Sequence, residues 1–215
     1  MIVSVFLTAL MLILLLNPIN AIAQEPVTAP NWHDRTATEA LLAVLANRAE
    51  QIDSLQGKFQ QQKQLQGLPL PLTATGNFSY SQDQGLNWHT LSPVNSQLQI
   101  GNKSASNAGT LGSNTNASLV ANIFIAVVRG DLRQLQQYFT IQSSGDTAHW
   151  RLRLTPIKET LASYLSYIDV AGAELTEQLY IAEAGGDTTS IKLSNSVSST
   201  QANEVKGKGI VKGEQ

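Results

Sequence analysis

The residue types that most often carry catalysis or hold metals are few in this chain of 215 residues. Its three histidines, His33, His89 and His149, are far apart, and none has a second histidine or a glutamate at the helical spacing of zinc enzymes. There is no cysteine, which excludes disulfides and thiolate chemistry. The sequence also lacks the glycine-rich motifs of nucleotide sites and the serine motif of hydrolases. We therefore expect no metal, no cofactor and no catalytic residues.

The charge balance excludes two further classes of protein. Fourteen basic residues stand against sixteen acidic ones, which gives a formal net charge of −2. Binding to nucleic acid or to an anionic membrane surface needs a basic excess. We therefore expect neither kind of partner.

Large apolar residues are the strongest candidates for a binding site in this sequence. They recur on one face of several strand-like segments and along one helix-like stripe, where they would suit an apolar ligand. The candidate binding residues are Phe78, Tyr80, Leu86, Trp88, Leu98, Ile100, Ile123, Phe124, Val127, Leu152 and Leu154. The alternative is that these residues only fill a core, and the two interpretations differ in whether the fold leaves a cavity.

Two periodicities predict the elements that position these residues. Apolar residues three, four and seven apart predict a helix over residues 37–54, with Thr36 and Glu39 as its capping box. From Gly57 the period changes to two, which predicts strands. Beyond the alternating stretches at 57–65 and 72–78, the strands expected are 77–80, 86–91, 97–100, 139–142, 149–155, 164–170, 174–184 and 188–194.

Two more helices are expected in the middle of the chain. Residues 101–118 are rich in Gly, Ser and Asn and predict a loop, after which Ser118 caps a helix that ends near Gly130. Asp131 and Gln134 suit the cap of a short third helix. Seven or more antiparallel strands with a few helices make an α+β fold, and a sheet of that size curls into a barrel or half barrel.

The ends of the chain predict export. Ile2–Leu16 is an apolar run of about fifteen residues, shorter than the roughly 20 of a membrane-spanning helix, and Ala21-Ile22-Ala23 suits a signal peptidase. We expect a signal peptide over 1–23, cleaved after Ala23, with a retained anchor as the alternative. A flexible leader (24–36), one domain (37–200) and a frayed tail (201–215) follow.

Five pieces of the chain, in order, resemble the periplasmic outer-membrane lipoprotein carrier family (LolA). The resemblance covers roughly residues 38–195. Its pieces are Ser54–Gln61, Gly76–Phe78, Leu86–His89 with Pro93, Trp150–Lys158, and Glu174–Leu179 with Gly186–Ile191. Two departures indicate a divergent branch: Gln82 stands where the family has an arginine that bonds its lid, and the 101–118 loop replaces a Trp-x-Tyr strand pair.

The resemblance implies a half-open antiparallel barrel of about eleven strands, with helices as a lid over an apolar cavity. It also implies a periplasmic monomer that takes the acyl chains of lipoproteins from an inner-membrane transporter and delivers them to an outer-membrane acceptor. Another acylated lipid is the alternative cargo.

Three hypotheses follow for the function. The first is a carrier of acylated cargo. The second is an interaction or sensor module of the same fold, which binds lipidated proteins without transporting them. The third is an enzyme acting on lipids, for which His89, His149 and Asp83 are the residues to replace first.

Overall fold

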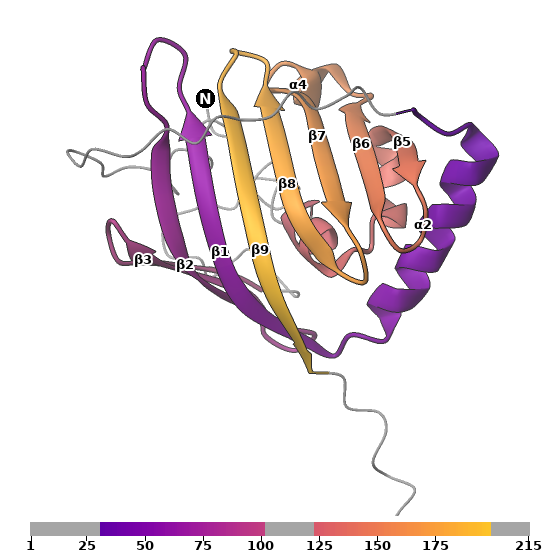
Figure 1. Cartoon of the computed structure of the whole chain (residues 1–215), viewed down its shortest axis with the longest axis horizontal. Helices are drawn as coiled ribbons and strands as arrows, with labels where there is room; N and C mark the ends of the chain where they lie inside the picture. The colour runs from indigo at the N-terminus through magenta and orange to yellow at the C-terminus, as the bar shows by residue number, and fades with distance from the viewer. Residues whose placement is uncertain (1–30, 102–122, 199–215) are drawn as a thin grey trace, which may run out of the picture.

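A single open antiparallel sheet dominates the computed structural model, which describes residues 31–101 and 123–198. The sheet has nine strands in the order β4-β3-β2-β1-β9-β8-β7-β6-β5. Their bounds are β1 (Ser54–Gln64), β2 (Leu72–Ser81), β3 (Gly85–Ser92), β4 (Ser96–Ile100), β5 (Phe139–Gly145), β6 (Trp150–Pro156), β7 (Leu165–Gly172), β8 (Thr176–Glu183) and β9 (Thr188–Ser198). The end strands β4 and β5 do not pair with each other, so the sheet curls without closing (Figure 1).

Short helices accompany the sheet. They are α2 (Arg35–Glu50), a helical segment at 123–129, the 3₁₀ helix η1 (Arg133–Gln137) and α4 (Glu159–Ala162). α2 lies beside β5 (Figure 1), and the Thr38 and Ser143 hydroxyls are 3.0 Å apart. The N–H of His33 donates to the carbonyl of Ser143 at 2.7 Å, so the residues before α2 also bond the free edge of the sheet. Covering an edge in this way prevents its pairing with other chains.

Alternation along the strands decides which side chains face the core. In β1, Leu55, Phe59, Gln61 and Lys63 are buried, whereas their exposed neighbours face solvent. The close packing of this face needs glycine at Gly57, because an added Cβ would lie 2.9 Å from the Phe78 ring. The concave face of the sheet therefore carries the core.

The fold class expected from the sequence is confirmed. The structure is α+β, with a curled, half-open antiparallel sheet and helices against its concave face. The resemblance implies eleven strands, and the described residues form nine. The buried row Trp150, Leu152 and Leu154 lies on one face of β6, as its alternation predicts.

Three details of the helices differ from expectation. α2 begins at Arg35, so Thr36 lies inside its first turn and is not the N-cap, and it ends at Glu50 because β1 starts at Ser54. The N-cap of η1 is Leu132 and not Asp131, whose carboxylate accepts a bond from Gln134 Nε2 at 3.3 Å. α4 was not predicted, because four residues are too short for a periodic signal.

Several expectations concern residues outside the described ranges. These are the signal peptide at 1–23, the loop at 102–118, the Ser118 cap and the tail at 201–215. Among the described residues, no helix combines the length and the apolar character needed to cross a membrane.

Candidate functional site: an apolar cavity with a polar end

A cavity of about 370 Å³ lies between the concave face of the sheet and the helical segment 123–129. This volume is within the range of small-molecule sites, which is about 300–1,000 Å³. One wall of the cavity comes from strands early in the chain, namely β1, β3 and β4, and the other wall comes from the late strands β7, β8 and β9. The cavity therefore exists only because the sheet curls.

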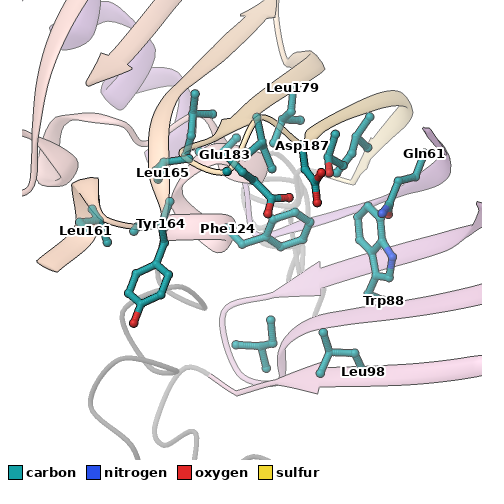
Figure 2. A pocket seen from close by; sticks show the side chains of 18 of the residues that line it. Gln61, Trp88, Leu98, Phe124, Leu161, Tyr164, Leu165, Leu179, Glu183 and Asp187 are labelled. Carbon is teal, nitrogen blue, oxygen red and sulfur yellow. The ribbon is translucent and has the colours of Figure 1, made fainter. Parts of the chain in front are cut away.

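Aromatic rings form the wall on the β3 side. The Trp88 ring stacks on Phe59 at 3.8 Å between centroids and meets the Phe124 ring edge-on at 5.0 Å. Leu98 and Ile100 of β4 extend this wall. Figure 2 shows Trp88 and Phe124 between Leu98 and the carboxylates of Glu183 and Asp187. Such a surface suits a hydrocarbon chain.

Aliphatic side chains in register form the opposite wall. Leu179 on β8 pairs with Ile191 on β9, and Ile168 on β7 pairs with Ile181 on β8. All four line the cavity, together with Leu161 of α4. Cross-strand neighbours of this kind present a continuous apolar surface.

The helical segment 123–129 contributes Ile123, Phe124 and Val127 to the cavity and is held at its C-terminal end. The Thr176 hydroxyl of β8 donates to the carbonyl of Val127 at 2.7 Å. Arg129 lies over the Tyr80 ring at 5.2 Å, and its Nη2 donates to the carbonyl of Ala49 at 3.4 Å. Helix ends need such partners for their free carbonyls.

Gln82, which stands where the family that the sequence resembles has an arginine, is exposed. The bond of Thr176 joins the helical segment to β8, and the bond of Arg129 joins it to the C-terminal end of α2, beside the apolar packing of Val127 and Val128 in the core.

One end of the cavity is polar. Lys63, whose side chain is 2% exposed, places Nζ 2.8 Å from Oε1 of Glu183, and Glu183 lines the cavity. Asp187 also lines it and accepts the backbone N–H of Gln66 at 2.8 Å. Figure 2 shows both carboxylates turned towards the side where Phe124 and Trp88 lie.

Three atoms of the cavity-lining residues are buried without a hydrogen-bond partner in the described structure. They are Oε1 of Gln61, Nε1 of Trp88 and Oγ1 of Thr189. Buried polar atoms almost always have a partner in protein, water or ligand. The protein itself therefore leaves one polar atom unpaired in each of these three cavity-lining residues.

The structure divides the eleven predicted binding residues into two groups. Six line the cavity, namely Trp88, Leu98, Ile100, Ile123, Phe124 and Val127. The other five are core residues at most 3% exposed and are not among the cavity-lining residues, namely Phe78, Tyr80, Leu86, Leu152 and Leu154. Leu152 and Leu154 lie next to the β5 edge, where α2 and η1 pack, and Phe78 fills the space above Gly57.

Sequence reasoning missed the polar end and the aliphatic wall. The alternation in β1 already places Gln61 and Lys63 on the same face as Phe59, so two polar residues at inward positions were the available signal. Nothing in the sequence indicated that Glu183, 120 residues away from Lys63, would be the partner.

The outer face of the sheet carries a second group of polar residues. Arg153 bonds both carboxylate oxygens of Asp169, with Nε 2.7 Å from Oδ1 and Nη2 2.6 Å from Oδ2. Its guanidinium lies 4.2 Å from the Tyr167 ring centroid and 5.1 Å from that of Trp32. We call these four residues the outer-face cluster.

Two pKa values respond to this arrangement. The hydrogen bond to Asp169 raises the pKa of Arg153 above its usual value. Burial raises the pKa of Tyr167 above its usual 10.0, because a phenolate is poorly solvated there. The cluster is therefore complete in itself and explains the half-buried Arg153 structurally.

The histidines have ordinary partners or none that suggests chemistry. Nδ1 of His33 is 3.2 Å from the Ser143 hydroxyl, and Nε2 of His89 is 3.1 Å from Oδ1 of Asn95. His149 is exposed beside the β5–β6 turn. Across residues 31–101 and 123–198, no three His, Asp or Glu side chains lie close enough to share a metal ion.

Comparison with known proteins gives likeness of structure only. No protein-family model and no curated protein matches the sequence. One similar solved structure is a chain of the MucA/MucB complex of Pseudomonas aeruginosa, with 13% identity and a TM-score of 0.44 over 81% of this chain. The match covers 61% of the Pseudomonas chain, so this protein spans about three fifths of that length.

Two further structures are similar over most of their length. A LolA superfamily protein from Nitrosomonas europaea has 9% identity and a TM-score of 0.34, with 73% of this chain and 93% of that one covered. A DUF1329 family protein from Desulfovibrio piger has 13% identity and a TM-score of 0.28, with 75% and 93% covered. The superfamily that the sequence resembles is thus represented among the structures similar to this chain.

Proposed function

We propose that this protein binds the acyl chain of a lipid or lipoprotein in its cavity and carries that cargo through the periplasm between the inner and outer membranes. The observation that supports the proposal is the cavity of about 370 Å³ between the aromatic wall at Trp88 and Phe124 and the aliphatic wall of β7–β9. At ~30 Å³ for each water-sized group, this space holds about a dozen methylenes of one chain.

The energetics favour such a cargo. Burying a methylene group contributes about 0.8 kcal/mol, so a chain of a dozen gains on the order of 10 kcal/mol on leaving water. A lipid crossing an aqueous compartment needs this shielding. The cavity wall formed by 123–129 is one short segment anchored by Thr176 and Arg129, which is compatible with later release.

Binding of a fluorescent acyl dye to the full chain tests the first part of the proposal. The wild type is expected to bind the dye, and Leu98→Glu is expected to reduce the affinity at least about tenfold, because a charge on the cavity wall opposes an apolar ligand. Leu91→Glu is the matched control, since Leu91 is 47% exposed and is not a cavity-lining residue. A wild type that ignores the dye and carries no lipid in native mass spectrometry contradicts the proposal.

A transfer assay separates the carrier from the sensor. Donor vesicles that contain labelled lipoprotein are incubated with unlabelled acceptor vesicles and the protein. A carrier accelerates the delivery of the label to the acceptor vesicles, whereas a sensor binds the lipoprotein without delivering it. The partners proposed for a carrier are an inner-membrane releasing transporter and an outer-membrane acceptor, and the working form proposed is a monomer. In the same assay, chemical alteration of the lipid would indicate an enzyme. We propose that the protein is not an enzyme and that the lipid is delivered unaltered.

The proposed location of the protein can be tested separately. We propose export with cleavage after Ala23, so the mature protein in the periplasmic fraction should begin at Gln24. An intact N-terminus in the membrane fraction would show a retained anchor, which ties the protein to one membrane and opposes a diffusing carrier.

A further inference from the structure

The polar end of the cavity has more hydrogen-bonding capacity than the protein itself uses. Gln61, Trp88 and Thr189 line the cavity and are each at most 2% exposed, and each has one buried polar atom with no partner in the described structure. Thr189 on β9 pairs in register with Lys63 on β1, two positions along from Gln61. Figure 2 shows the Gln61 amide beside the Trp88 indole. A purely apolar chain would leave these atoms unpaired, at a cost.

The types of atom restrict what pairs with them. The indole N–H of Trp88 only donates, so it needs an acceptor on the ligand. The Gln61 oxygen only accepts, so it needs a donor, and the Thr189 hydroxyl serves either role. A group that only accepts, such as an ester, leaves Gln61 unpaired. A group that only donates, such as an ammonium, leaves Trp88 unpaired.

The charges at this end restrict the ligand further. Lys63 is already paired with Glu183, and Asp187 adds a second carboxylate to the cavity lining. One cation and two carboxylates make the local formal charge negative, which opposes a fatty-acid anion or a phosphate in a desolvated site.

We propose that this end of the cavity recognises an uncharged group at the head of the acyl chain that both donates and accepts a hydrogen bond, namely a carboxamide or a hydroxyl. Its carbonyl or hydroxyl oxygen accepts from Trp88 and Thr189, and its N–H or O–H donates to Gln61. The inference rests on the proposed acyl-chain function and adds the chemistry of the linkage next to the chain.

Competition among ligands of one chain length tests this inference. The full-length protein is loaded with the apolar dye N-phenyl-naphthylamine, which is then displaced at pH 7 by dodecanamide, dodecanol, methyl dodecanoate, dodecanoate or dodecylamine. Dodecanamide and dodecanol should displace the dye at concentrations about tenfold lower than the other three. The stronger of these two identifies the source as an amide-linked chain or a hydroxyl-bearing lipid.

Variants that remove a hydrogen-bonding atom show whether the named atoms are responsible. Thr189→Val and Trp88→Phe should each reduce the preference for dodecanamide over methyl dodecanoate about three- to tenfold, and this ratio cancels any general change that a variant causes in the affinity of the cavity for apolar chains. Thr188→Val, on the other face of β9, is the control and should keep the preference. Thr189→Val should not lower the melting temperature of the ligand-free protein, because it removes a buried hydroxyl that has no partner.

The two proposals fail differently. A wild type that does not bind the dye overturns the acyl-chain function. A wild type that binds the dye but shows no preference among the five ligands overturns only the inference about the polar end. A preference that persists in both variants, or a Thr189→Val protein that melts earlier with its preference intact, also overturns that inference.

Discussion

The two faces of the sheet treat their ion pairs in opposite ways. On the outer face, Arg153 makes two bonds to Asp169 and lies near two aromatic rings. On the inner face, the single bond from Lys63 to Glu183 is almost completely buried, and the cavity that Glu183 lines is also lined by three residues with unpaired polar atoms. The hydrogen bonds of the outer-face cluster are satisfied by the protein alone, whereas those of the polar end of the cavity are not. Unsatisfied polar atoms are therefore a better indication of a ligand site than charge itself.

The inner face also contains two kinds of apolar residue, those in the core and those on the cavity wall. Introducing a charge at a core residue should have the largest effect on folding of all the changes considered. Leu86 is 0% exposed and is not a cavity-lining residue, so Leu86→Glu should prevent stable folding by burying an unpaired charge. Phe124 is only half-buried and lines the cavity, so Phe124→Glu should leave a folded protein that binds an acyl dye at least about tenfold more weakly. Circular dichroism and dye titration measure the two effects. Equal loss of folding in both variants would remove the distinction between core and cavity wall.

Removal of Lys63 tests the buried ion pair. Lys63→Met should lower the free energy of unfolding by about 3–5 kcal/mol, because Glu183 is left buried without its partner. The double variant Lys63→Met, Glu183→Leu should regain most of this loss, since it buries no charge. Urea unfolding of the wild type, Lys63→Met, Glu183→Leu and the double variant gives the coupling between the two residues. A single variant as stable as the wild type would show that the pair is solvated.

The matching change on the outer face should have a smaller effect. Arg153 and Asp169 have side chains 31% and 21% exposed, so solvent screens their attraction. Arg153→Ala should therefore lower the free energy of unfolding by about 1 kcal/mol, with a loss that shrinks in high salt. A loss as large as that of Lys63→Met would contradict the contrast between the faces.

The smallest expected effect is a dependence on alkaline pH. The pKa of Tyr167 is raised in the folded protein, so the folded state holds this proton to higher pH than the unfolded state. Stability is thus unaffected well below the unfolded pKa of about 10 and falls as pH rises through and above it. Tyr167→Phe should reduce this fall in urea unfolding measured from pH 8 to 11. An identical pH profile in the variant would assign the effect to other groups.

Much of the secondary structure was predictable because it depends on local patterns. The alternation in β3, β6 and β9 identified strands and their buried faces, and Gly130, with φ of 80°, ends the helical segment where the sequence placed its end. The errors fell at helix ends, such as the start of α2 at Arg35, where a local capping pattern competes with tertiary contacts. The short α4 gave no periodic signal at all.

The binding residues were predictable only as a class. Leu86 lies in the core and Leu98 lies on the cavity wall, yet both are apolar and face inwards. The sequence does not separate them, because alternation encodes the face of a strand and not the distance to the opposite wall. That distance depends on how far the sheet curls and on where segment 123–129 lies.

By itself, the sequence determined that this chain forms an antiparallel sheet with one apolar face, since side-chain period and turn residues act over a few positions. Only the tertiary structure decided that this face encloses a cavity and that the cavity has a polar end. The pairing of β1 with β9 and of β9 with β8 brings Lys63 to Glu183 across 120 positions of sequence, a contact that no local pattern encodes.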